Sequence, residues 1–403
     1  MNLRNHFLDH YSKGDLIIAF SVMIQPLLVV LQFIMISVFY FPEEVSTRYR
    51  VIFTAIPMLA AIIVGFKRKT TVFLLCYAVL FLFLGIEYLF FPANGGYIWT
   101  VSFRFLVPMI VPSIICLSCL NNVNVVEDAI YIYSWFIIVL ILFFVLRFIQ
   151  GGVDFKTYNM GLSYALLLPM VSLYKKGRWY SILAAFFCFV CILVFGSRGA
   201  LVAGMLYVVY DLCQRNAKNI LYIMLASFFI MGAAVQFGDF LDAQGVSSRT
   251  LNFLIGGGLA SAEGRDVIYE QVIKLIRDNW LIGLGIYGDR IWMNDEYCHN
   301  IILELFIDFG VIVGSIIVII ALFFILNLYL KIDYNKRNVL IKYFIVLLVP
   351  FFVSSSYLID CNFGVFWGII MLLDKDIERV RLKLFPQIKI VNPFKTNISS
   401  EVL

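Results

Sequence analysis

The sequence predicts an all-α integral membrane protein of about twelve transmembrane helices with one large structured extracytoplasmic loop. Of its 403 residues, 62% are hydrophobic and only 14% are charged, and the mean hydropathy is +0.93. Soluble domains carry roughly 25% charged residues, so a soluble fold is excluded. The apolar runs are unbroken, whereas the strands of a membrane β-barrel alternate apolar and polar residues, so we expect helices.

Each expected span is an apolar run that can cross, or nearly cross, a bilayer. In order, the spans cover residues 16–40, 51–66, 72–91, 97–120, 129–149, 161–174, 179–196, 199–213, 219–237, 303–328, 339–359 and 362–373. The runs 161–174, 199–213 and 362–373 are the shortest, and about fourteen residues cross only a locally thinned bilayer. Residues 1–15 are polar and no small-residue cleavage site follows the long first span, so we expect an uncleaved first helix.

Lysine and arginine in the short loops set the expected orientation. If the spans alternate in direction, most basic segments fall on one side: Lys67–Lys69, Lys175–Arg178, Arg215–Lys218, Lys331–Arg337 and Lys375–Lys395. Arg48 and Arg50 fall on the other side and are outweighed. We therefore expect both termini in the cytoplasm. The net charge of +5 reflects this asymmetry and indicates no nucleic-acid partner.

The longest polar interval is the loop 238–299, which this orientation places outside the cell. Apolar residues recur at helical spacing over Ala262–Asn279, which predicts a lid or interfacial helix within the loop. The glycines of Gly256–Gly258 interrupt the chain before this helix. We detect no internal repeat and no soluble domain, so residues 1–403 are expected to form a single polytopic domain.

Charged residues inside spans are costly and are candidates for function. The candidates all fall in the outer part of the bilayer: Glu87, Arg104, Arg147, Arg198 and Asp360. Structural alternatives stay open, because arginines near span ends can snorkel and Glu87 can pair with Arg104. Arg198 differs from the others. It lies in a tight turn between small residues, where a helix N-terminus adds backbone amides, and this predicts an outward-facing phosphate or diphosphate site.

His299 is the only histidine outside the first ten residues, and it lies where the loop meets the next span. The same loop contains arginines that could bind an anion: Arg249, Arg265, Arg277 and Arg290. An imidazole titrates near neutral pH, so this pattern predicts a general base beside an anion site. The structural alternative is a solvated loop that happens to contain a histidine.

Four short motifs, taken in order, resemble those of the O-antigen ligase/polymerase superfamily. They are Gly196-Ser197-Arg198-Gly199-Ala200, then Glu263-Gly264-Arg265, then Trp280-Leu281-Ile282-Gly283-x-Gly285, then His299-Asn300 leading through Glu304 to Phe309-Gly310. The resemblance covers roughly residues 160–330. In the family, an arginine after a span, a loop arginine and the histidine before the next span form the active region. This carries over to Arg198, Arg265 and His299.

The resemblance implies an inverting, metal-independent glycosyl transfer without a cofactor, at the outer face of the bacterial cytoplasmic (inner) membrane. The donor would be an oligosaccharide on undecaprenyl diphosphate, with the bilayer and a chain-length regulator protein as further partners. The Phe-, Ile- and Tyr-rich character of the chain resembles the polysaccharide polymerases of the superfamily, so we expect a polymerase, and the alternative is a ligase that transfers the polysaccharide to lipid A core. The chemistry of the residues agrees, because diphosphate leaves readily once cations neutralise it and a base takes the acceptor proton.

Roles follow for the candidate residues. Arg198 and Arg265 would hold the diphosphate, and His299 would accept or orient the acceptor proton. Further substrate-binding candidates are Arg290, Arg249, Arg104, Arg147, Glu304, Asn300 and Asn159. Asn159 matches the family pattern less closely, and Glu304 can equally be a solvated helix end. No metal site is expected: the pairs Cys116-x-x-Cys119 and Cys188-x-x-Cys191 lie in apolar helices without histidine or charge nearby.

A transporter or flippase for the same lipid-linked substrate is the competing class. It would also need about twelve spans and buried arginines. Such proteins place polar residues near the bilayer midplane and are built from two related halves. The sequence shows neither feature, and one long external loop favours chemistry at a single face.

Overall fold

The computed structural model describes residues 10–151, 160–215 and 265–384, and within these ranges the chain is helical without a β-strand. The first part contains α2 (Lys13–Val22), α3 (Gln25–Ser37), α4 (Glu43–Arg68), α5 (Thr70–Phe90), η1 (Pro92–Asn94), α6 (Gly95–Tyr97), η2 (Ile98–Ile110), α7 (Val111–Ser118) and α8 (Asn124–Ile149). The second contains α9 (Met160–Lys175), α10 (Trp179–Val194) and α11 (Arg198–Arg215). The third contains α14 (Arg265–Asp278), α15 (Gly288–Trp292), α16 (Ile301–Lys331), α17 (Tyr334–Tyr343), η3 (Phe344–Leu348), η4 (Val349–Phe352) and α18 (Cys361–Leu384).

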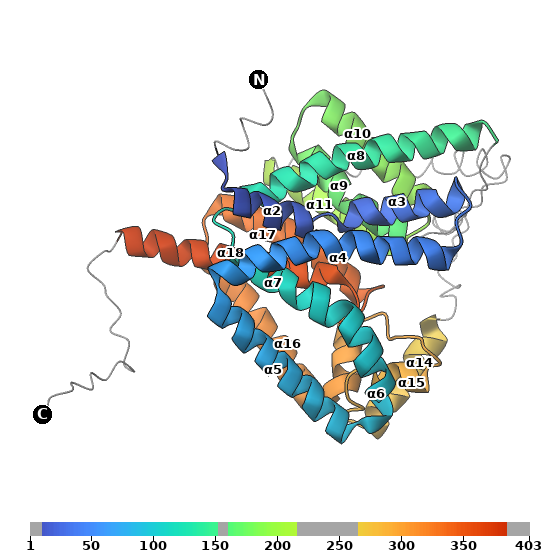
Figure 1. The fold of residues 1–403 in the computed structure, drawn as a ribbon, viewed down its shortest axis with the longest axis vertical. Helices are drawn as coiled ribbons and strands as arrows, with labels where there is room; N and C mark the ends of the chain where they lie inside the picture. The colour runs from blue at the N-terminus through green and yellow to red at the C-terminus, as the bar shows by residue number, and fades with distance from the viewer. Residues whose placement is uncertain (1–9, 152–159, 216–264, 385–403) are drawn as a thin grey trace, which may run out of the picture.

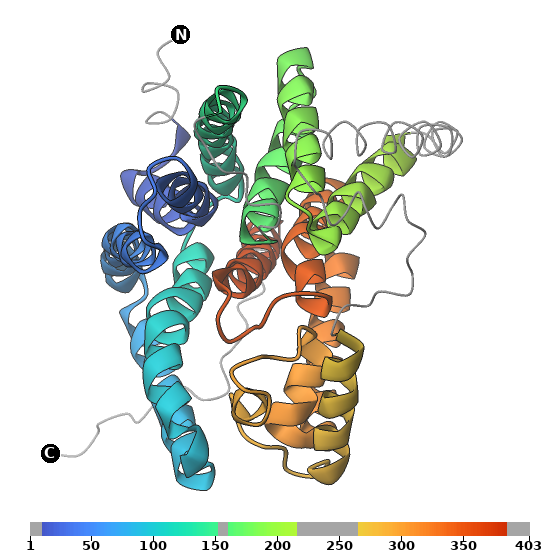
Figure 2. The ribbon, with the colours of Figure 1, turned by 90° about the vertical axis from the view of Figure 1, so that its right-hand side faces the viewer.

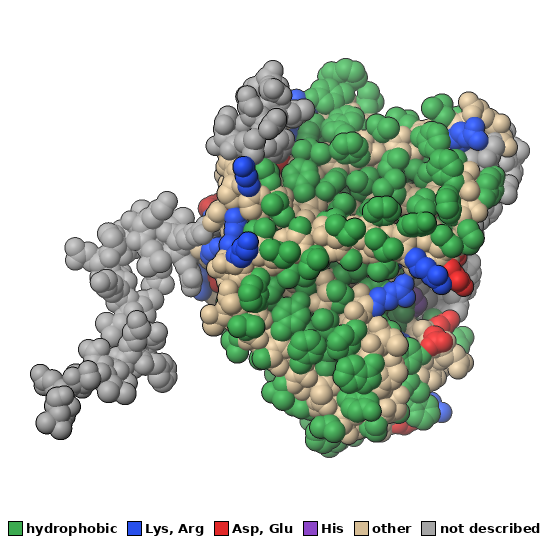
Figure 3. Space-filling model, in the orientation of Figure 1, with side chains coloured by type: hydrophobic (Ala, Val, Ile, Leu, Met, Phe, Trp, Pro, Cys, Tyr) green, Lys and Arg blue, Asp and Glu red, His purple; other side chains and the backbone are tan. Residues whose placement is uncertain are grey.

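The outward faces of the long helices are apolar, as expected for a membrane protein. Figure 3 shows one face covered mainly by hydrophobic side chains. In the described segments, Ile56 of α4 is 64% exposed, Leu82 of α5 is 65% exposed and Phe323 of α16 is 70% exposed. Such exposure would be unfavourable in water but suits contact with lipid. The chain is therefore an all-helical membrane protein.

Five helical segments in the described ranges are long and apolar enough to cross a membrane: α4, α5, the run Pro92–Ser118, α8 and α16. The pair α2 and α3 makes a sixth if it is one span bent by 44°. The expected number of about twelve is thus not reached on length and composition. One reason is that α9 and α10 have only 16 residues each. In addition, the predicted span 339–359 is divided among α17, η3 and η4, while 219–237 lies outside the described residues.

Helix α9 is the centre of the larger half of the bundle. It packs against α3, α8, α10 and α11, and nearly all its side chains from Leu162 to Leu173 are buried. Figure 1 shows α3, α4 and α8 side by side in this half. In Figure 2, α14, α15 and the start of α16 lie together at one end of the molecule. The candidate site lies between these two parts.

Several loops predicted to be cytoplasmic meet at the opposite end of the bundle. The guanidinium of Arg68 bonds Asp15 near the N-terminus. Lys375 of α18 donates to the carbonyl oxygen of Leu120 over 3.1 Å. Lys176 pairs with Asp128 over 3.3 Å. The structure thus groups these loops at one end, as the alternation of spans predicts. Which compartment this end faces remains a prediction.

Two glycines allow the loop before α15 to pack on α16 backbone to backbone. Gly283 and Gly310 both have positive φ, 78° and 76°, and Gly310 interrupts the helical geometry of α16. The amides of Leu284 and Gly285 donate to the carbonyl oxygens of Ile307 and Asp308 over 2.7 and 3.0 Å. This pairing explains why the motifs around Gly283 and Gly310 need glycine.

The predicted loop helix is present as α14. Its apolar side packs on the first turns of α16 in a cluster that includes Val272, Ile307, Met293 and Cys298. The predicted boundary Ala262–Asn279 begins outside the described residues, and the observed helix runs Arg265–Asp278. Its packing fixes the loop that carries His299 against the membrane helices.

Candidate functional site

The ring of His299 is oriented by a backbone carbonyl. Its Nδ1 atom lies 3.2 Å from the carbonyl oxygen of Ser354. A carbonyl can only accept a hydrogen bond, so Nδ1 carries the proton and, in the neutral ring, Nε2 carries the lone pair. The ring of Tyr297 lies 4.1 Å away between centroids. These two contacts fix the orientation of the His299 ring.

The backbone of His299 has a left-handed conformation, with φ of 55°. Hydrogen bonds made by the two adjacent residues hold it there. On one side, the amide of Cys298 donates to Asp289 Oδ2 over 3.3 Å. On the other, Asn300 caps α16: its Oδ1 accepts from Ile302 N over 3.0 Å, and its Nδ2 donates to Phe352 O over 3.1 Å. A residue other than glycine adopts a positive φ only at a cost in conformational energy, so the surrounding contacts must stabilise this conformation.

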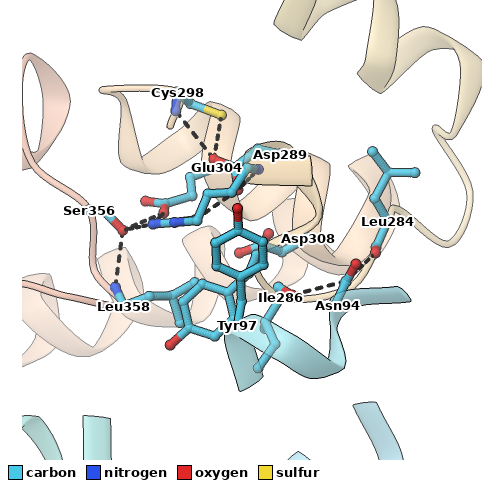
Figure 4. A network of polar contacts seen from close by, with 12 residues as sticks. Asn94, Tyr97, Leu284, Ile286, Asp289, Cys298, Glu304, Asp308, Ser356 and Leu358 are labelled. Carbon is cyan, nitrogen blue, oxygen red and sulfur yellow. Dashed lines mark hydrogen bonds and ion pairs between the residues drawn. The ribbon is translucent and has the colours of Figure 1, made fainter. Parts of the chain in front are cut away.

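A buried network of ion pairs and hydrogen bonds lies beside the loop that carries His299 (Figure 4). Arg290 is 4% exposed, and its guanidinium bonds Asp289 over 2.8 Å, Glu304 over 3.2 Å and Ser356 Oγ over 2.9 Å. Burial opposes the charged form of Arg290, but Asp289 and Glu304 outweigh burial and raise its pKa above the usual value. The network therefore ties α15, α16 and the segment 353–360 together around a permanent cation.

The carboxylates of the network are fully buried on α16. Ser356 Oγ donates to one oxygen of Glu304, and Tyr357 donates to Asp308 over 2.6 Å. The other oxygen of each carboxylate has no hydrogen-bond partner within the part of the chain that the structure describes. In the same ranges, no group of three or more His, Cys, Asp or Glu side chains is arranged to hold a metal ion.

The turn at Arg198 lies beside the same segment. Gly196 has a φ of 81°, and Ser197 Oγ accepts from Ala200 N over 3.3 Å at the start of α11. A Cβ on Gly199 would collide with the Tyr164 hydroxyl and would lie 3.3 Å from Ser354 Oγ. The Arg198 turn and His299, 101 positions apart in the sequence, therefore both lie at Ser354.

The other arginine candidates lie further out. Arg104 of η2 is exposed, with its guanidinium 5.2 Å from the centre of the Phe105 ring. Arg147 is exposed at the end of α8. Arg50 of α4 is close enough to Arg104 for electrostatic repulsion between the two guanidinium groups. In the described segments, no carboxylate forms an ion pair with Arg50 or Arg104.

Two sequence expectations change. Glu87 does not pair with Arg104: its Oε2 accepts from the amide of Ile286 over 3.0 Å and holds the loop. Glu304 is not a solvated helix end, because it is fully buried and bonded to Arg290 and Ser356. Asn159 and Arg249 lie outside the described residues. The backbone of Arg265 begins α14, but its side chain is outside what the structure describes.

Sequence reasoning missed the segment 353–360, which supplies the contacts that join the site. Ser354 contacts His299, Ser356 contacts Arg290, and Ser355 donates to Asp360 over 2.6 Å. The sequence feature that could have revealed this segment is the run Ser354-Ser355-Ser356-Tyr357, in which four side chains with hydroxyl groups lie between two apolar runs. In the sequence, this run falls at the end of the predicted span 339–359.

The comparison with protein families matches the part of the chain that builds this site. Residues 183–319 match the family model described as O-antigen ligase. No curated protein matches the chain. The match spans Arg198, the loop, His299 and most of α16, which are the elements that carry the sequence motifs. Over this segment, the chain is similar to the O-antigen ligase family, which supports the resemblance of its motifs to the O-antigen ligase/polymerase superfamily.

Proposed function

We propose that this protein is a membrane glycosyltransferase that joins undecaprenyl-diphosphate-linked oligosaccharide repeat units into a polysaccharide. The reaction would take place at the outer leaflet of the bacterial inner membrane, with inversion and without a metal ion. One observation carries the proposal: the Arg198 turn and His299 both lie at Ser354. Displacement of a diphosphate by a hydroxyl requires a cation and a base, and Arg198 and His299 are the candidates for these two roles.

The proposed step is a single displacement. The acceptor hydroxyl oxygen forms a bond to the anomeric carbon while the bond from that carbon to the diphosphate oxygen breaks. The electron pair leaves with the diphosphate, whose added charge Arg198 and Arg265 stabilise, and the hydroxyl proton passes to Nε2 of His299. Arginine suits the diphosphate because its planar fork binds two oxygens at once.

Other candidates take supporting roles in this proposal. Arg104 and Arg147 lie exposed at the membrane helices, where they would contact phosphate or sugar, and Arg50 joins Arg104 there. Asn300 and Glu304 would act through the loop: Asn300 caps α16, and Glu304 holds Arg290. Arg249 and Asn159 remain substrate-binding candidates by position in the sequence. A chain-length regulator protein is the expected protein partner.

A ligase is the second candidate, because the matching family model is described as O-antigen ligase. Its donor chemistry would be the same, and only the acceptor differs: lipid A core in place of a second lipid-linked unit. We favour the polymerase because the Phe-, Ile- and Tyr-rich character of this chain resembles the polymerases of the family. A flippase is the third class, and it requires transport without bond formation.

Deletion of the gene, followed by gel analysis of lipid-linked and surface polysaccharide, separates these functions. Loss of a polymerase leaves single repeat units on the carrier at the outer leaflet. Loss of a ligase leaves long chains on the carrier. Loss of a flippase leaves no precursor at the outer leaflet, and that result would contradict a glycosyltransferase. Complementation with wild-type protein is the control.

A further inference from the structure

Ser354 contacts both halves of the candidate site. Its carbonyl oxygen accepts from the Tyr297 hydroxyl over 2.9 Å and lies 3.2 Å from His299 Nδ1. Its hydroxyl accepts from the Tyr164 hydroxyl over 2.7 Å. Tyr164 in turn lies against Gly199, next to Arg198. Ser354 is 3% exposed, so water does not compete for these bonds.

We infer that Tyr297, Ser354 and Tyr164 are positioning residues of the transfer reaction, which set the His299 ring and its separation from the Arg198 turn. This inference rests on the proposed function. Tyr297 fixes the carbonyl that orients His299 and also lies beside its ring. Tyr164 holds the same serine from the Arg198 side. Displacement of reacting groups by about 1 Å can cost a factor of about 100 in rate, so a rigid connection between base and cation would matter.

The surroundings of Tyr297 keep it a hydrogen-bond donor. Burial, together with the carboxylates of Glu304 and Asp360, raises the pKa of Tyr297 well above its usual value, although Arg290 acts in the opposite direction. The Arg290 guanidinium lies 5.6 Å from the centre of the Tyr297 ring. Tyr297 is therefore uncharged at neutral pH, and it joins the ion network to the carbonyl that orients His299.

The test uses Tyr297→Phe and Tyr164→Phe in the full-length purified protein, with lipid-linked repeat units as substrate. Each variant keeps the ring and loses one bond to Ser354. The matched control is Tyr210→Phe on α11, which loses a 2.7 Å bond to Asn338. Tyr210 lies twelve residues beyond Arg198, roughly 18 Å along the helix. kcat, donor KM and thermal stability are measured for each protein.

We expect kcat to fall roughly 10- to 100-fold in both site variants, with donor KM and stability close to those of the control. The acid limb of the pH–rate profile of Tyr297→Phe should move to higher pH. Without the Tyr297 donor, the Ser354 carbonyl accepts more strongly from Nδ1 and favours the imidazolium. In a His299→Asn background, Tyr297→Phe should cost no further activity, because the group it positions is gone.

Distinct results would overturn the inference and the proposed function. If wild type transfers sugar and both site variants match the control, the three residues are not positioning residues. The inference is also refuted if Tyr297→Phe lowers activity by the same factor in the wild-type and His299→Asn proteins and leaves the acid limb of the pH–rate profile unchanged. That result would indicate a role in folding only. If well-folded wild type binds the donor but joins no sugars, the proposed polymerase function itself is refuted.

Discussion

Gly283 and Gly310 contact each other through their backbones at the junction of the external loop and α16. A Cβ on Gly283 would lie 2.5 Å from the amide nitrogen of Gly310, and one on Gly310 would lie 2.5 Å from the carbonyl oxygen of Leu281. Both residues also have positive φ. This contact fixes where the helix with Glu304 and Asp308 meets the loop with Asp289 and Arg290.

Gly310→Ala should therefore destabilise the loop–helix junction. The added methyl group meets backbone atoms that cannot move independently, and alanine disfavours positive φ, so we expect a loss of about 1–3 kcal/mol. Thermal unfolding in detergent measures it. Gly85→Ala on α5 is the matched control, because no atom lies within 4 Å of its added Cβ. Equal stability of Gly310→Ala and Gly85→Ala would contradict the packing described here.

The buried network around Arg290 gives a second prediction. Arg290→Met leaves Asp289 and Glu304 without their cation and should cost roughly 3–5 kcal/mol, as when one partner of a buried pair is removed. Arg290→Lys should recover little, since one ammonium cannot reach Asp289, Glu304 and Ser356 together. Thermal stability and proteolysis of the loop 280–300 are the measurements. The control is Arg147→Met, at an exposed position. Wild-type stability of Arg290→Met would refute the role of the network.

The proposed anion site gives a third prediction. Arg198→Lys and Arg265→Lys should each weaken binding of the lipid diphosphate, because lysine keeps the charge but loses the bidentate fork. Binding of a lipid diphosphate to purified protein measures the effect. Arg215→Lys, at the other end of α11, is the control. If Arg198→Ala and Arg265→Ala both bind the donor as well as the control does, neither arginine belongs to the diphosphate site.

Membrane orientation is the fourth prediction. Single cysteines in a cysteine-free protein should react with an impermeant reagent from outside at position 270 and should not react at 177 or 335. Position 270 is exposed on α14, 177 lies in the basic turn after α9, and 335 lies in the first turn of α17, beside Lys336 and Arg337. Labelling after the membrane is permeabilised shows that each cysteine is reactive. Reaction of position 177 in intact cells would reverse the orientation.

The sequence predicted the helical membrane class and the parts of the site that lie in continuous motifs. Apolar length revealed most helices, and helical spacing revealed α14. His299 stood out because the chain has only three histidines, and Arg198 stood out because it lies among small residues in a turn between two apolar runs. Their meeting point could not be predicted, because Ser354 is contributed by a distant segment, and hydroxyl and carbonyl contacts leave no spacing pattern.

Broken helices explain the main difference between expected and observed spans. The run 339–359 is mostly apolar, yet it contains the end of α17, a π-helical turn and a 3₁₀ turn before the chain opens at 353–360. Irregular backbone at membrane depth is tolerated where protein groups satisfy it. Here Asn300 and Tyr297 bond the carbonyls of Phe352 and Ser354. Hydropathy cannot register such a break, because the side chains that compensate come from another loop.

The role of His299 as the base is the central claim, and His299→Asn tests it most directly. Asparagine tolerates the left-handed backbone conformation that His299 adopts, so the loop should keep its shape. Turnover of lipid-linked repeat units and affinity for the lipid diphosphate are measured separately on purified protein. Turnover should fall roughly 10²–10⁴-fold, and donor affinity should remain that of wild type. Near-normal turnover in His299→Asn would remove His299 from the mechanism.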